Sequence, residues 1–576
     1  MEHIESPVAE FLKSPKIAYF SMEIGILNDM HTYSGGLGVL AGDTIRSAAD
    51  LKIPLLAVTL LSKKGYFRQA IDPAGNQSEG PADWDPAKFT EPLPEKIYLE
   101  IEGRHVAVKA WLFVQKSITG GKVPILFLDT DLPENAQTDR EITWHLYGGD
   151  ERYRLKQEIV LGMGGVRILR KLGFDIRKYH MNEGHASLLT LELLLEHQRD
   201  IESVWDEDLV WDVDKVKEMC VFTTHTPVEA GHDRFSYELV KDVLGEIIPL
   251  RVLKKLAGQE KLNMTHLALN LTEYVNGVAK KHKEVSMMMF PGYEFSSITN
   301  GVHSFTWTHK NLRLLYDKHL PGWANEPELF VRVDRLPEDE LWAAHMACKR
   351  ELIDLVNRKT GSSMNCDTLT IGFARRATAY KRGTLVFRDL ERLARIGAGK
   401  IQLVFAGKAH PKDTPGKAGI KKIFDCIAGL KGKVEAAYLP DYDMELALTL
   451  VSGVDIWLNT PRPPREASGT SGMKAAHNGV PNFSILDGWW IEGHIEGYTG
   501  WAIGSVYTEG ADVTEEERDA QDAEDLYRKL EEIIIPTYYN NRHLWIRIMQ
   551  NAIGKNAYYF NTHRMMLRYV TEAYIR

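Results

Sequence analysis

Three short segments of the 576-residue chain combine glycine, hydroxyl side chains and cations in patterns that suit phosphate binding. The first is Tyr33–Gly38 (YSGGLG), which opens an expected helix. Consecutive glycines let the backbone approach a ligand closely, and the free N–H groups at a helix N-terminus attract anions. A dinucleotide fingerprint fits less well, because the preceding expected strand ends far upstream. A turn that only caps the helix stays an alternative.

The second segment concentrates positive charge directly after an expected strand. Arg375–Arg382 (RRATAYKR) carries four cations within eight residues. At the carboxyl end of a parallel strand these side chains would face a ligand cleft, where Arg and Lys clamp phosphate. A solvated run of surface charge is the alternative, and the adjoining apolar strand weighs against it.

The third segment, Arg465–Lys474 (REASGTSGMK), is a loop of small residues that runs into an expected helix. Its N–H and hydroxyl groups can surround a phosphate. Lys474 follows one turn into the helix, and a lysine amine is the group that forms a Schiff base with pyridoxal phosphate. Taken alone, a lysine on a helix is more often a surface residue.

These segments need buried strands and covering helices to position them, and the hydrophobic pattern predicts both. Short β-rich apolar runs alternate with helical patterns, which indicates an α/β protein with parallel sheets and helices on both faces. Strands are expected at Ile17–Phe20, Leu55–Leu61, Val123–Leu128, Val221–Thr224, Leu369–Phe373, Leu403–Ala406, Val434–Tyr438, Val454–Leu458 and Phe483–Leu486. Helices are expected after Gly38 and at Leu155–Leu172, Leu188–His197 and Asn561–Ile575.

The order of these patterns predicts two large units and a final helix. Strand signals stop after Asn300-Gly301, and a mostly helical stretch precedes the next strand series. We therefore expect a Rossmann-like, doubly wound N-terminal domain over residues 1–302 and a second such domain over 303–550. The helix within 551–576 is expected to cross back to the first domain.

Composition narrows the class of protein. Lys plus Arg is 70 and Asp plus Glu is 79, giving a net charge of −9, which argues against general binding of nucleic acid or anionic membranes. Four scattered cysteines make a zinc ribbon or a disulfide framework unexpected. No signal peptide or membrane span is apparent, so a cytoplasmic protein is expected. His180, Glu183 and His185 lack H-E-x-x-H spacing, and no metal site is expected.

The segment Glu466–Lys474 closely resembles the pyridoxal phosphate attachment motif of the α-glucan (glycogen, maltodextrin and starch) phosphorylases. Similar segments follow the same order along most of the chain: Tyr19–Gly25, Tyr33–Asp43, Asn182–Leu194, Thr224–Phe235, Thr299–His303, Arg375–Arg382, Ala406–Pro411 and Asp441-Tyr442. Because the first of them begins at Tyr19, the chain resembles a short form of the family, in which the allosteric N-terminal extension is absent.

The resemblance implies a GT-B fold, in which two Rossmann-like domains face a cleft. It implies reversible phosphorolysis of α-1,4-linked glucan or maltodextrin from the non-reducing end, giving α-glucose 1-phosphate with retained configuration. The implied cofactor is pyridoxal 5'-phosphate, and the implied partners are glucan, orthophosphate and glucose 1-phosphate. A homo-oligomer stays open.

The resemblance also implies a role for each matching residue. Lys474 would carry the cofactor, Tyr442 would lie near it, and its phosphate would be held by Arg375, Gly469, Thr470 and Ser471. Orthophosphate would be bound by Gly36, Arg376 and Lys381. The transferred glucosyl unit would contact Asn300, His225, Glu466, Gly469 and the loop at Gly35-Gly36. Glu273 is expected in the place of a sugar-contacting histidine.

Two other functions fit the same architecture. A nucleotide-sugar-dependent glucan synthase would share the two domains and the glycine-rich loop, but would need neither Lys474 nor pyridoxal phosphate. A non-catalytic glucan-binding protein would not need the combined set of Gly36, Arg376, Lys381 and Lys474. Lys474 therefore separates the phosphorylase from the synthase, and the full set of four residues argues against a non-catalytic protein.

Overall fold

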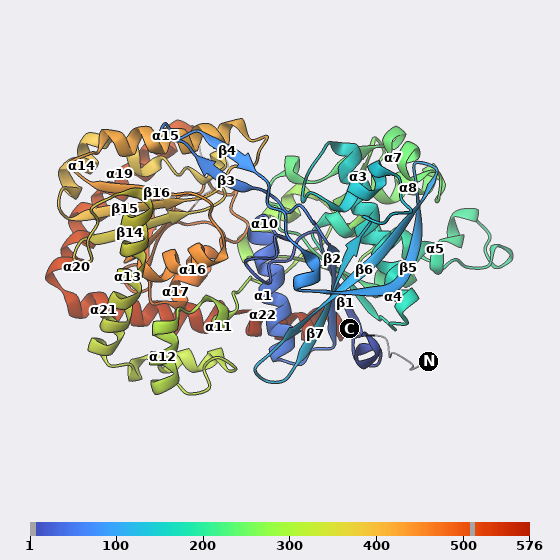
Figure 1. Cartoon of the computed structure of the whole chain (residues 1–576), viewed down its shortest axis with the longest axis horizontal. Helices are drawn as coiled ribbons and strands as arrows, with labels where there is room; N and C mark the ends of the chain where they lie inside the picture. The colour runs from blue at the N-terminus through green and yellow to red at the C-terminus, as the bar shows by residue number, and fades with distance from the viewer. Residues whose placement is uncertain (1–6, 507–512, 576) are drawn as a thin grey trace.

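The computed structural model describes residues 7–506 and 513–575, and within these ranges the chain forms two sheets rich in parallel strands, each flanked by helices (Figure 1). The prediction of a mixed α/β protein with parallel sheets is confirmed for this part of the chain. Residues 1–6, on which the expectation about a signal peptide partly rests, lie outside the described ranges.

The first sheet has the strand order β13-β12-β9-β8-β1-β2-β7-β6-β5. Its strands are β1 (Ile17–Ser21), β2 (Leu55–Leu60), β5 (Glu91–Ile101), β6 (Arg104–Lys116), β7 (Lys122–Asp129), β8 (Lys178–Asn182), β9 (Cys220–Thr223), β12 (Tyr274–Gly277) and β13 (Ser296–Ser297). From β13 to β7 all neighbours are parallel. Every residue of β1 and β2 is buried, which is why these strands are continuous apolar runs in the sequence.

The expectation of parallel pairing is wrong at one edge of this sheet. Strands β5 and β6 form an antiparallel hairpin, and β6 pairs antiparallel with β7. Glu102 and Gly103 connect the hairpin at φ of 53° and 69°, the left-handed pair that a tight two-residue turn requires. Part of β5 alternates between buried and exposed residues, so it lacks the continuous apolar run used to predict the other strands.

Helices pack on both faces of the first sheet (Figure 1). They are α1 (Gly36–Asp50), α2 (Gln137–Arg140), α3 (Glu151–Ile159), α4 (Gly165–Leu172), α5 (Leu189–Glu196), α6 (Val213–Met219), α7 (Tyr237–Leu244), α8 (Leu250–Ala257), α9 (Met264–Asn270) and α10 (Lys280–Met289). The helix predicted at Leu155–Leu172 is present as α3 and α4, joined by a π-helical turn at Val160–Gly164.

The second sheet is parallel throughout, in the order β16-β15-β14-β17-β18-β19. Its strands are β14 (Leu369–Ala374), β15 (Ile401–Ala406), β16 (Glu435–Leu439), β17 (Ile456–Asn459), β18 (Asn482–Ile485) and β19 (Gly500–Ile503). The helices before and around it are α11 (Ser304–Trp307), α12 (Lys310–His319), α13 (Glu338–Thr360), α14 (Leu390–Gly397), α15 (Thr414–Gly429), α16 (Met444–Gly453), α17 (Ser471–His477), α18 (Trp490–Gly493) and α19 (Glu515–Lys529). The predicted helical stretch between the two sheets is therefore present.

Two segments join the sheets. The hairpin of β3 (Arg68–Ile71) and β4 (Gln77–Gly80) reaches from the first unit over α15 (Figure 1). Gln69 Nε2 donates to the carbonyl of Gly407, directly after β15, at 2.8 Å. At the end of the chain, α20 (Ile535–Asn540) and α21 (Arg542–Asn551) lead to α22 (Thr562–Tyr569). Helix α22 packs on α1, with Thr562 Oγ1 at 2.5 Å from Ser47 Oγ. The domain boundaries at 302 and 550 stay a prediction.

Within the described ranges, no helix is both long enough and apolar enough to cross a bilayer. Two short antiparallel strands, β10 (Arg234–Ser236) and β11 (Lys261–Asn263), complete the elements of the first unit.

The close packing of α1 predicts different effects for two helix-interior glycines. A Cβ at Gly42 would lie 1.9 Å from the Gly25 carbonyl oxygen, whereas a Cβ at Gly419 in α15 would meet nothing within 4 Å. We expect Gly42→Ala to lower the free energy of unfolding by about 1–3 kcal/mol through overpacking. Gly419→Ala, the matched control, should raise it by up to about 1 kcal/mol. Chemical denaturation measures both, and equal effects would contradict the close approach of α1.

Candidate active site

The glycine-rich loop is held by a buried carboxylate that the sequence analysis did not single out. Glu23 Oε2 accepts from the backbone N–H groups of Ser34 (2.5 Å) and Gly35 (3.2 Å), and Tyr147 donates its hydroxyl to Oε1 (2.9 Å). The Gly35 N–H is therefore occupied, and Gly35 orients the loop. Gly36 is exposed at the start of α1, and a Cβ there would meet nothing within 4 Å. This leaves an open helix N-terminus for an anion.

Two predicted cations converge on one predicted carboxylate. Arg375 Nη2 lies 2.6 Å and Lys381 Nζ 2.5 Å from Glu466 Oε2, and all three side chains are at most 10% exposed. Burial opposes the negative charge of Glu466, but Arg375 and Lys381 outweigh it and lower its pKa to about 2. Glu466 is therefore ionised at neutral pH and holds both cations in place.

Beside this cluster, buried donors lack partners within the described residues. Arg375 Nη1 and Ser468 Oγ have no hydrogen-bond partner there. Gly469 turns the chain at φ +85°, and Thr470 follows as the N-terminal cap residue of α17. Buried polar groups are normally satisfied, so unsatisfied donors next to a helix N-terminus indicate a place for an anionic ligand.

The other predicted residues of this region lie close by. Ser471 Oγ accepts from Trp457 Nε1 at 3.1 Å, and its own hydroxyl hydrogen stays available. Burial raises the pKa of Tyr442, with Arg375 opposing the shift, which places the phenol near that guanidinium. Tyr442 also lines a cavity of about 190 Å³ together with Ser34 of the first unit.

Asp487 adds a titratable group that the sequence pattern did not reveal. Its carboxylate accepts from the N–H groups of Glu466 (2.8 Å) and Gly488 (2.9 Å). Burial, reinforced by the charge of Glu466, raises its pKa to about 7. Asp487 can therefore exchange a proton near neutral pH beside the Arg375–Glu466–Lys381 cluster.

Arg376 faces the first unit from the end of β14. Part of its surface reaches solvent, unlike that of Arg375, which is largely buried. The protein around the guanidinium still desolvates it and opposes its charge, but Tyr380, Tyr66 and Glu23 outweigh this effect and raise its pKa. Because Tyr66 and Glu23 belong to the first unit, the charge of Arg376 lies between the two units, on the side of the glycine-rich loop.

Lys474 lies at the junction of α1, α11 and α17. Its side chain is buried, and Nζ sits 3.8 Å from the centroid of the Trp307 ring. Over the part of the chain that the structure describes, Nζ has no hydrogen bond or ion pair. Burial lowers its pKa to about 8, although the charge of Asp43 opposes the shift. Asp43 of α1 also accepts a hydrogen bond from Trp307 Nε1 at 2.7 Å. Asp43 thereby holds the indole ring of Trp307 next to the Lys474 amine.

Two of the predicted sugar-contacting side chains, His225 and Asn300, lie in the first unit. His225 Nε2 is 2.6 Å from Asn182 Oδ1, and Asn182 donates its amide to Ser21 Oγ, so His225 Nε2 carries the hydrogen. Burial lowers the His225 pKa to about 3, so the ring is neutral and Nδ1 is an acceptor. Asn300 is 3% exposed, and its Oδ1 has no partner within the described residues.

Two sequence-based expectations fail here. Arg382 does not join the site, because it turns away at φ 46° and pairs with Asp519 (2.6 Å) and Asp522 (2.8 Å). Glu273 does not replace a sugar-contacting histidine. It precedes β12, at the opposite end of the strands from His225, and is half exposed with its carboxylate 3.8 Å from Lys178 Nζ.

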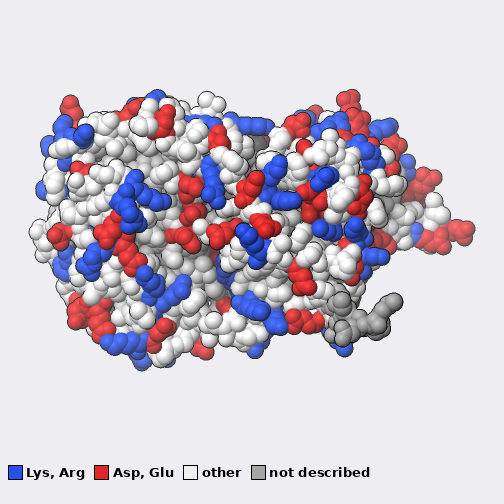
Figure 2. Space-filling view, viewed as in Figure 1, with Lys and Arg blue, Asp and Glu red and all other residues white. Residues whose placement is uncertain are grey.

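On the face that Figure 2 shows, acidic and basic side chains are intermixed, whereas the cations of the site are mostly buried.

Comparison with known proteins identifies a family and relatives of this chain. The carbohydrate phosphorylase family matches residues 211–570. Maltodextrin phosphorylase of Thermococcus litoralis is 40% identical, over 97% of this chain and 70% of that protein. Glycogen phosphorylase of Aquifex aeolicus is 36% identical, over 97% and 86%. An uncharacterized protein of Methanocaldococcus jannaschii is 33% identical, over 97% and 99%.

Fold, site and relatives together define an enzyme of the glycosyltransferase class. The chain belongs to the carbohydrate phosphorylase family, as the resemblance at Glu466–Lys474 predicted.

The environment of Lys474 predicts an unusual amine titration. A pKa of about 8 leaves about half of the amine neutral at pH 8, whereas an ordinary lysine titrates near ~10.4. In cofactor-free protein, modification by an amine-selective reagent should rise with a midpoint near pH 8, measured by mass spectrometry of the Lys474 peptide. The same peptide in urea-unfolded protein is the control. A native midpoint that matches the unfolded one would contradict the effect of burial.

Proposed function

We propose that this chain is a glycogen or maltodextrin phosphorylase that carries pyridoxal phosphate on Lys474. It cleaves α-1,4-linked glucan from the non-reducing end with orthophosphate, giving α-glucose 1-phosphate with retained configuration. Two observations carry the proposal: the buried Lys474 amine, which has no hydrogen bond or ion pair among the described residues, and the unsatisfied buried donors Arg375 Nη1 and Ser468 Oγ. The names of the Thermococcus litoralis and Aquifex aeolicus relatives support the substrate class. Family membership also supports a GT-B fold with units 1–302 and 303–550 and a final helix within 551–576.

The residues present fit the cofactor. The Lys474 amine would hold the pyridoxal carbonyl carbon covalently. Arg375, Ser468 and the turn at Gly469-Thr470 would hold the phosphate, because Arg375 Nη1 and Ser468 Oγ are buried donors without partners among the described residues. When bound, the cofactor would supply a phosphate group with a pKa near ~6, which can buffer a proton beside the substrate phosphate.

Orthophosphate would lie between the units. Arg376 supplies an exposed guanidinium from the second unit, and the open N-terminus of α1 at Gly36 supplies N–H donors from the first. Lys381 would add a third positive group, held in position by Glu466 at 2.5 Å. Two phosphate groups in one cleft need such compensation, and fixed charges in a partly buried site supply it without reorganisation.

The sugar-binding residues act as neutral acceptors. His225 Nδ1 and Asn300 Oδ1 can each accept a hydrogen bond from a glucosyl hydroxyl. In the reaction, orthophosphate gives its proton to the glycosidic oxygen, the bond from that oxygen to the anomeric carbon breaks, and a phosphate oxygen bonds to the same face of that carbon. The transition state has oxocarbenium character, which the adjacent phosphate charge stabilises. Because His225 stays neutral, it does not add positive charge there.

The cofactor assignment predicts a linked loss of colour and activity. The purified enzyme should release glucose 1-phosphate from maltodextrin and orthophosphate. Borohydride should fix pyridoxal to the Lys474 peptide, and Lys474→Ala should be colourless and nearly inactive. Active protein without any pyridoxal would refute the cofactor alone. Colourless wild type that pyridoxal phosphate cannot reconstitute, and that forms no glucose 1-phosphate, would refute the function as well.

The position of Arg376 predicts a defect in phosphate use. Arg376→Ala should lower kcat/KM for orthophosphate by about 10²–10³, because it removes a fixed charge from a low-dielectric site. Lys474 would stay loaded, and the absorption spectrum would stay unchanged. Arg395→Ala, at an exposed arginine that pairs with Glu531, is the control. An unaltered phosphate dependence would remove Arg376 from the site.

A further inference from the structure

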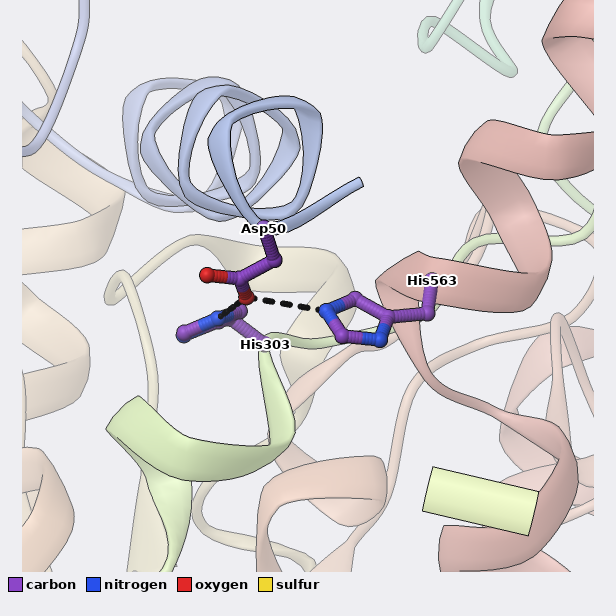
Figure 3. A group of neighbouring side chains, drawn as sticks. All are labelled: Asp50, His303 and His563. Atoms are coloured by element: carbon purple, nitrogen blue, oxygen red, sulfur yellow. Dashed lines mark hydrogen bonds and ion pairs between the residues drawn. The ribbon is translucent and has the colours of Figure 1, made fainter. Parts of the chain in front are cut away.

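Behind the candidate site, three side chains from distant parts of the sequence meet at one carboxylate oxygen (Figure 3). Asp50 ends α1, His303 precedes α11, and His563 lies in the first turn of α22. Asp50 Oδ2 is 2.7 Å from His303 Nε2 and 2.9 Å from His563 Nε2. One ligand atom from each side chain lies within 4.8 Å of the others.

The three side chains are largely shielded from water, and Ser117 holds the Asp50 carboxylate in position by a hydrogen bond. The side chains of Asp50, His303 and His563 are 10%, 7% and 4% exposed. Ser117 donates its hydroxyl to Asp50 Oδ1, so Oδ2 faces the two rings. Both oxygens of the Asp50 carboxylate are therefore in contact with buried polar groups, Oδ1 with Ser117 and Oδ2 with the two imidazole nitrogens.

The hydrogen-bond partners of His563 require a cation inside the cluster. His563 Nδ1 lies 3.2 Å from the Asn325 carbonyl oxygen, which can only accept, so Nδ1 carries a hydrogen. In a neutral ring Nε2 is then an acceptor, and it faces the Asp50 oxygen, a second acceptor, at 2.9 Å. Either an extra proton or a metal ion must lie between them.

We propose that Asp50, His303 and His563 bind one divalent transition-metal ion of the zinc class. Two imidazole nitrogens and one carboxylate oxygen are typical ligands for such an ion. The Asn325 carbonyl takes the second ring N–H of His563. His303 Nδ1 accepts from the Thr306 backbone N–H at 3.3 Å and lies 2.7 Å from Thr306 Oγ1, so without an ion Nε2 carries the ring hydrogen. An ion on Nε2 would displace that hydrogen, and Nδ1 would then carry one and donate it to Thr306 Oγ1. Ligating histidines commonly have such partners, which fix the ring and its tautomer.

The present distances are those of the hydrogen-bonded form. A tetrahedral ion with bonds of about 2.0–2.1 Å separates its ligand atoms by about 3.3 Å, so each ring must withdraw by roughly half an ångström. Water would take the fourth position. The expectation of no metal site was based on the absence of a local ligand motif in the sequence. This cluster has no such motif, because His303 is 253 residues and His563 is 513 residues from Asp50.

The test uses the full chain, freed of metal by a chelator, and titrated with Co²⁺ and Zn²⁺. We expect one equivalent of Co²⁺ per chain, a visible absorption spectrum of nitrogen and oxygen coordination, and a higher unfolding temperature. Asp50→Asn and His563→Gln should abolish this binding. His543→Gln, at a histidine that is 74% exposed, should leave it unchanged.

Ser117→Ala keeps all three ligands and removes only the outer hydrogen bond to Asp50. It should weaken metal affinity by about 10–100-fold. If the ligand variants fail to fold, this variant and the wild type decide the question. Folded wild-type protein that binds neither ion stoichiometrically would overturn the proposal, and an extra proton would then fill the cluster. Binding that survives in the ligand variants would also overturn it.

Discussion

Helix α1 must lie against the Gly25 segment, and this contact sets the position of three residues on one of its faces. Any side chain at Gly42 would strike the Gly25 carbonyl, so the helix axis cannot move outward without losing the fit. Residues seven apart on a helix differ by only about 20° in direction. Gly36, Asp43 and Asp50 therefore follow one another along the same side. Gly36 is exposed at the start of the helix, Asp43 contacts Trp307 above Lys474, and Asp50 contacts His303 and His563.

The electrostatics explain how an acidic chain can recognise anions. The net charge of −9 describes the whole sequence, whereas the site depends on a few buried cations with fixed partners. Glu466 holds Arg375 and Lys381 within 2.6 Å, and Arg376 stays exposed beside them. Removing one member of a buried pair leaves an uncompensated charge, so these groups constrain one another. In the proposed function, a phosphate would meet donors whose positions are already fixed.

The sequence predicted the parallel strands well, because strands buried on both faces appear as continuous apolar runs. It missed the β5–β6 hairpin, whose residues partly alternate between core and solvent. Resemblance singled out Lys474 as a candidate, but it did not indicate Trp307, whose ring contacts the amine and which lies far away in the sequence. Arg376 and Arg382 come from one basic segment, but Arg376 is exposed, whereas Arg382 is buried against Asp519 and Asp522. Arg382 has left-handed backbone dihedrals, which turn the chain at this residue. Spacing alone does not reveal such a turn.

The metal cluster and the candidate site are connected through neighbouring residues on the same elements. Trp307, which covers the Lys474 amine, lies four residues after His303 on α11. Arg564, next to His563, donates to the carbonyls of Thr299 (2.7 Å) and Asn300 (3.0 Å). Asp50 ends the helix that begins at Gly36. An ion that fixes these three elements relative to one another would therefore act at once on the start of α1, on the surroundings of Lys474 and on the loop at Asn300.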